Sequence, residues 1–94
     1  MTLGVLTLQL HIPGCSSLKE KRSRLKPLLS RLHKEFNISV AEMDHNDAWR
    51  EAAIACALVS NDQVQAQRAL QQVIKWIETY WPDVQVETEH LEII

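Results

Sequence analysis

Histidine and carboxylate side chains are the residues of this chain best suited to acid–base or metal chemistry. His11 ends the first segment of alternating apolar residues, and a later segment begins at Trp49 and Glu51. If the two segments pair as antiparallel strands, His11 lies beside Trp49 and Glu51, and the polar turn at residues 44–47 adjoins them. Imidazole and carboxylate groups can bind divalent metals or transfer protons. The predicted polar cluster comprises His11, Asp44, His45, Asp47, Trp49 and Glu51.

No established motif accompanies this cluster. The sequence contains no HxH, HExxH or CxxC spacing for a metal, no GxSxG nucleophile, and no GxxxxGKS/T or GxGxxG phosphate loop. Turns are also rich in Asp and Asn for reasons of backbone conformation. We therefore predict no catalytic residue, no metal site and no cofactor, and a non-enzyme is favoured over an enzyme.

A second set of side chains is cationic and lies on one predicted helix. Ser17, Lys19 and Glu20 belong to a capping-box pattern in which Ser17 caps the helix. Cations near a helix N-terminus oppose the helix dipole, and a local conflict of this kind can mark function. With the N–H groups of the preceding loop, the helix could follow the phosphates of a nucleic acid without reading its bases. The predicted anion-binding set is Ser17, Lys19, Lys21, Arg22, Arg24, Lys26, Arg31 and Lys34.

Charge is divided unevenly along the chain, although the formal net charge is only −2. Residues 1–36 carry seven Lys and Arg against two acids, a net +5, whereas residues 37–94 carry three against ten, a net −7. The protein is therefore a dipole whose positive end is one helix. The alternative is that the cations are merely solvated, or that they pair with the acidic half of this chain or of a neighbouring subunit.

Hydrophobic periodicity predicts the elements that position these residues. Alternation over residues 3–12 indicates a strand with one core face. Leucines at helical spacing indicate a helix over residues 17–36, kinked near Ser23 because Pro27 removes a backbone hydrogen bond. Further strands are predicted at residues 38–43, 49–59 and 84–94. A second helix is predicted to begin at the capping signal of residues 60–63, with Asp62 in its first turn, and to end at residue 81.

The order strand, helix, strand, strand, helix, strand predicts a single domain over residues 1–94. Right-handed crossovers in two βαβ halves give an α+β fold, the ferredoxin-like βαββαβ sandwich, an antiparallel four-stranded sheet with two helices on one face. The first and third strands are central. Small apolar residues on the open face, such as Ala53 and Ala55, are compatible with a homodimer through that face; the alternative is a face left to solvent. The chain shows neither a leader nor a run of about 18 apolar residues, so we expect a cytoplasmic protein without a membrane partner.

Three segments together, HIPGCSSLKEKR, FNISVAEMDHNDAW and ALVSND, resemble the YlxP family of small bacterial proteins of unassigned function. The resemblance covers nearly the whole chain and implies the same ferredoxin-like fold. Genes of the family often lie beside those for a translation initiation factor and ribosome-binding factor A, which implies an accessory role in ribosome maturation or translation. The motif positions carried over are His11, Pro13, Gly14, Ser17, Leu18, Lys19, Glu20, Lys21, Arg22, Asp47 and Trp49.

Charge placement and this resemblance lead to one functional expectation. The chain is expected to be a non-enzymatic, cytosolic binding protein that docks on ribosomal RNA or a ribosome assembly particle through its basic helix. The alternative is a dimeric small-ligand-binding or metal-dependent enzymatic domain that uses the edge formed by His11, Asp44, Asp47 and Trp49.

Overall fold

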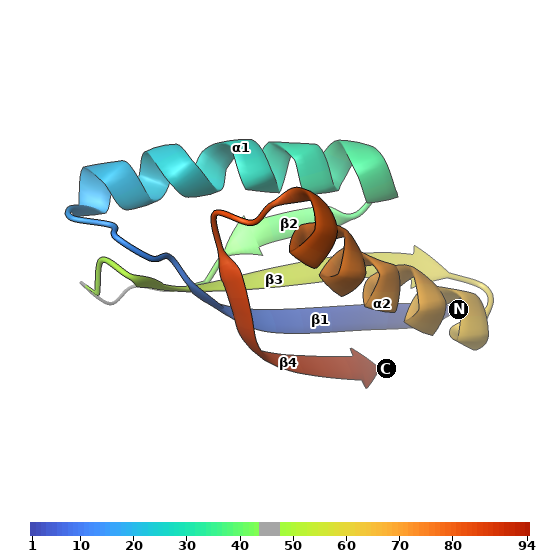
Figure 1. Cartoon of the computed structure of the whole chain (residues 1–94). Coiled ribbons are helices and arrows are strands. Elements are labelled where there is room, and N and C mark those ends of the chain that lie inside the picture. The colour runs from blue at the N-terminus through green and yellow to red at the C-terminus, as the bar shows by residue number, and fades with distance from the viewer. Residues whose placement is uncertain (44–47) are drawn as a thin grey trace.

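The computed structural model describes residues 1–43 and 48–94 and has the predicted α+β architecture. Its elements are β1 (Thr2–His11), α1 (Leu18–Phe36), β2 (Ser39–Glu42), β3 (Glu51–Ser60), α2 (Gln63–Tyr80) and β4 (Gln85–Ile93). The strands form one antiparallel sheet in the order β2-β3-β1-β4, and both helices cover the same face (Figure 1). The first and third strands are central, which confirms the predicted ferredoxin-like arrangement.

Alternation in β1 and β3 decides which face of the sheet meets the helices. Leu8 of β1 pairs with Ile54 of β3, and both side chains are fully buried. The residues on either side of each, such as Thr7 and Ala53, are only half-buried because they point to the open face. Burial of this kind on one face only is typical of an antiparallel sheet with helices on one side. The core therefore lies between β1, β3 and the two helices.

Gly4 allows α2 to pack closely on β1. A Cβ atom at this position would lie 2.8 Å from the Cδ1 of Leu70, which is shorter than any ordinary carbon–carbon contact. Leu70 is fully buried, together with Ala66 one turn earlier on the same helix. A missing side chain in a strand often marks such a close approach.

The helix α1 runs unbroken from Leu18 to Phe36 and shows no sharp bend in Figure 1, so the kink predicted near Ser23 is wrong. Pro27 lies exposed on the outer side of α1, where the carbonyl that loses its N–H partner can reach water. The predicted cap is confirmed, since the N–H of Glu20 donates to the Ser17 hydroxyl at 3.0 Å. The helix ends at Asn37, which has a φ of 50° in the left-handed region.

Candidate functional site

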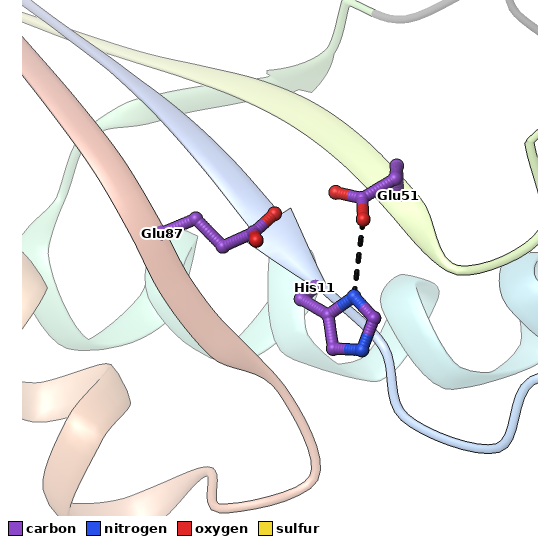
Figure 2. Close-up of side chains that lie close together, drawn as sticks. All are labelled: His11, Glu51 and Glu87. Carbon is purple, nitrogen blue, oxygen red and sulfur yellow. Dashed lines mark hydrogen bonds and ion pairs between the residues drawn. The ribbon is translucent and has the colours of Figure 1, made fainter.

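Three side chains from three neighbouring strands meet on the open face of the sheet, and we call them the His11 cluster: His11 of β1, Glu51 of β3 and Glu87 of β4. The ladder places His11 opposite Glu51, as the sequence predicted, and their Nδ1 and Oε1 atoms are 3.1 Å apart. Figure 2 shows the Glu87 carboxyl group extending toward the same point from the other side of β1. One ligand atom from each of the three residues lies within 4.8 Å of the others.

A β-bulge brings Glu87 into this cluster. On the β1–β4 ladder, Gln9 pairs with Thr88 but Leu10 pairs with Val86, so Glu87 is an extra residue without a partner on β1. A bulge interrupts the alternation of side chains and re-aims the residue it adds. The sequence-based prediction did not include Glu87, because strict alternation gives no signal for the position of a bulge.

The two carboxyl groups of the cluster influence each other's ionisation in opposite directions. A hydrogen bond with Glu87 and the contact with His11 lower the pKa of Glu51 from its ordinary value of 4.5. The same hydrogen bond to Glu51, together with partial desolvation and the negative charge of Glu51, raises the pKa of Glu87. One proton shared between two close carboxyl groups behaves in this way. The cluster can therefore hold a proton, and its His and Glu ligands could hold a cation.

Other members of the predicted polar cluster are placed differently or not described. Trp49 lies just before β3 with a side chain that is 50% exposed. Asp44, His45 and Asp47 lie outside the described residues, so their predicted proximity to His11 stays a prediction. Of the six predicted residues, the structure brings His11 and Glu51 into direct contact.

The eight residues predicted to bind anions divide into those that contact other parts of the protein and those that are exposed without such a contact. Lys21 belongs to the first group and is the clearest exception to the prediction. Its side chain is only 3% exposed, and Nζ donates a hydrogen bond to the Ala48 carbonyl at 3.0 Å. The burial follows from spacing, because Lys21 precedes Leu25, Leu28 and Leu32 on the buried stripe of α1. Lys21 is thus a structural residue that ties α1 to the segment before β3, and it is not part of a surface for phosphate.

Three more of the eight residues form hydrogen bonds or ion pairs within the protein. The guanidinium group of Arg24 donates to the carbonyls of Pro13 and Asp83, both at 2.8 Å. Arg31 pairs with Glu35 at 3.2 Å and lies over a tryptophan ring of α2. The Ser17 hydroxyl caps α1. Arg24 and Arg31 thus connect α1 to neighbouring segments of the fold, and Ser17 stabilises its first turn.

The remaining four cations form what we call the basic stripe: Lys19, Arg22, Lys26 and Lys34. All four side chains are exposed, and within residues 1–43 and 48–94 none of them has a hydrogen-bond or ion-pair partner. At 100° and 1.5 Å per residue they occupy about 120° of the outer face of α1 along about 22 Å. Among the described residues, therefore, no carboxylate of the acidic half pairs with these four cations.

An aromatic groove, missed by the sequence-based reasoning, lies beside the C-terminal part of α1. It is a hollow of about 520 Å³ lined by Arg31, Glu35, Trp76, Tyr80 and Trp81. The ring centroids of Trp76 and Trp81 are 6.0 Å apart. The guanidinium carbon of Arg31 lies 5.7 Å from the centroid of the Trp76 ring. Tyr80 is 66% exposed. Helical spacing of aromatics is typical of core and helix-end packing, but the exposure of Tyr80 shows that its ring is not fully packed.

The open face of the sheet carries small apolar side chains along β3. Ala53, Ala55 and Ala57 are half-buried there, and Val59 is exposed. The predicted homodimer through this face stays a prediction. In the part of the chain that the structure describes, no helix has the length and apolar character needed to span a membrane.

Comparisons with known proteins agree with the fold and the resemblance. The model of a family described as a protein of unknown function, DUF503, matches residues 3–90. The uncharacterized protein YlxP of Bacillus subtilis (strain 168) is 34% identical over 83 residues, which cover 88% of this chain and 89% of that protein.

Solved structures support the fold alone, because their sequence identities are low. A de novo designed protein, LFR1 1, with a ferredoxin fold is 9% identical at a TM-score of 0.53, over 98% of this chain and 85% of that one. The VAO-type flavoprotein MtVAO713 from Myceliophthora thermophila C1 is 10% identical at a TM-score of 0.60; 99% of this chain corresponds to 18% of that protein. The family match and the identity to YlxP confirm the resemblance seen in the sequence: the chain belongs to the DUF503 family and is a YlxP-like protein with a ferredoxin-like fold.

Proposed function

We propose that this protein is a non-enzymatic binding protein that docks on RNA through the basic stripe, as an accessory factor in ribosome maturation or translation. The observation that carries the proposal is the lack of intramolecular partners for Lys19, Arg22, Lys26 and Lys34 among the described residues. Like charges on one helix face repel one another, and an anionic partner removes this repulsion. Phosphates spaced along a nucleic-acid strand supply such a partner.

The contacts of Arg24 and Arg31 support the same reading. Arg24 binds the carbonyls of Pro13 and Asp83, and Arg31 lies over the Trp76 ring of α2, so the stripe is carried by a helix that contacts the rest of the fold. The ribosomal part of the proposal rests on the gene neighbourhood implied by the YlxP-like resemblance, which is an association and not a mechanism.

The aromatic groove gives the same surface a place for an unpaired base. Single-stranded RNA is recognised largely by stacking of splayed bases on aromatic side chains. Tyr80 is exposed, and Arg31 at the edge of the groove belongs to the same helix as the basic stripe. Replacing Tyr80 by Ala should therefore weaken single-stranded RNA binding about fivefold or more, whereas Tyr80→Phe should retain it.

Salt dependence of binding to ribosomal RNA tests the proposal. Four phosphate contacts predict a slope of log K against log salt of about −2.8 for single strands and about −3.6 for duplex. Between 50 and 200 mM salt the affinity should then fall about 50- to 150-fold. Each replacement of a stripe cation by Gln should reduce the slope by about 0.7–0.9. Binding with a slope near zero, or no binding at low salt, would refute the proposal.

A further inference from the structure

We propose that the His11 cluster binds one divalent first-row transition-metal ion, of the Zn²⁺ or Mn²⁺ type, through His11, Glu51 and Glu87. The site lies on the open face of the sheet, whereas the basic stripe lies on α1 over the other face. The inference is independent of RNA docking, because neither site needs the other.

Distances in the cluster suit a metal after a small side-chain movement. Zn²⁺ binds imidazole nitrogen and carboxylate oxygen at about 2.0–2.2 Å, so two tetrahedral ligands lie about 3.4 Å apart. The Nδ1 of His11 and the Oε1 of Glu51 are already 3.1 Å apart. Glu87 is within 4.8 Å and exposed, and a change of rotamer brings its carboxylate the remaining distance.

The backbone fixes these ligands from three directions. His11 and Glu51 face each other across the β1–β3 ladder, and Glu87 enters from β4 at the bulge. Glu87 is the extra residue of the bulge between the pairs Gln9–Thr88 and Leu10–Val86. A ladder without the bulge would have no additional β4 residue beside His11 to supply this carboxylate. Ligands carried by paired strands are held more precisely than ligands carried by loops.

The local charges also favour a cation. Two carboxyl groups face one imidazole, and the ammonium of Lys21 is the other positive group that influences Glu51. The Nζ of Lys21 donates a hydrogen bond to the Ala48 carbonyl at 3.0 Å. A divalent ion there would balance the negative charges of Glu51 and Glu87, which repel each other when both carboxyl groups are ionised.

The donor set narrows the choice of ion. One imidazole nitrogen with two carboxylate oxygens is typical of zinc, manganese or iron sites, whereas calcium and magnesium prefer oxygen alone. Three protein ligands leave the remaining coordination positions to water, because all three side chains are reached by solvent.

Titration calorimetry with ZnCl₂ and with MnCl₂ on the intact, untagged chain tests the inference. We expect one saturable site per chain with at least one of the ions, and His11→Ala or Glu87→Gln should weaken it tenfold or more. The matched control is Glu89→Gln, which removes the same charge from the neighbouring part of β4 and should leave binding unchanged. Circular dichroism of each metal-free variant establishes that the fold is retained.

Three results would overturn the inference. One is the absence of saturable binding of either ion up to about 1 mM. Another is binding that His11→Ala and Glu87→Gln leave intact. The third is a site lost on His90→Ala and kept in His11→Ala, which would place the ion at the exposed pair His90 and Glu92, 3.1 Å apart on β4.

Discussion

Replacement of Lys21 by Met tests whether this lysine stabilises the fold, in contrast to the basic-stripe cations that are proposed to bind RNA. Met has a similar length and fills the same space, but it removes the hydrogen bond from Nζ to the Ala48 carbonyl. A hydrogen bond from a charged donor contributes about 1.5–3 kcal/mol, and the 3% exposure of Lys21 leaves little screening by solvent. In a domain of this size 1 kcal/mol shifts the Tm by about 4–8 °C, so Lys21→Met should lower it by about 6–24 °C.

Urea denaturation and RNA affinity, measured on the same preparations, test this prediction. The denaturation midpoint of Lys21→Met should fall with little change in slope, while RNA affinity at a temperature where the variant is folded should stay near that of the parent. The matched control is Lys26→Met, which should change stability by less than about 0.5 kcal/mol and weaken RNA binding. A Lys21→Met protein with parental stability and lost RNA affinity would refute the structural role.

Three further predictions concern stability and reactivity. Because the pKa of Glu87 is raised in the folded protein, ionisation of this carboxyl group above its ordinary pKa of 4.5 destabilises the fold. Glu87→Gln should therefore raise the Tm at pH 7, and the Tm difference should vanish near pH 3.5. A Tm difference that does not change with pH would contradict this prediction. Burial raises the pKa of Cys56 to about 11, so iodoacetamide at pH 8 should label it only in urea, as mass spectrometry can show, and rapid labelling of the native chain would contradict this. Gly4→Ala should lower the free energy of unfolding by about 1–2 kcal/mol, because its Cβ meets Leu70; an unchanged urea midpoint would show that Leu70 moves aside without cost.

Most of the architecture was predictable because each element has a local signal. Alternation of leucines marks β1, the Ser17 hydroxyl marks the start of α1, and Pro82 follows the end of α2. The straight course of α1 was not predictable, because the effect of Pro27 depends on whether the helix face around it is buried or solvated.

The candidate sites were predictable only where they depended on local pattern. The pairing of His11 with Glu51 followed from the antiparallel order of two strands. The position of Glu87 in the cluster could not be predicted, because a bulge depends on how β4 pairs with β1 and gives no periodic pattern in the sequence. Lys21 could have been recognised as buried, since it lies four residues before Leu25 on the apolar stripe.

The measurement that tests RNA docking most directly is co-sedimentation with ribosomal particles for two charge-reversed variants. Arg22→Glu with Lys26→Glu changes the basic stripe, and Arg68→Glu with Lys75→Glu makes the same change in net charge on exposed positions of α2. We expect the first variant to lose co-sedimentation at low salt and the second to retain it. Equal sedimentation of both variants and the parent, or equal loss in both, would contradict a role for the basic stripe.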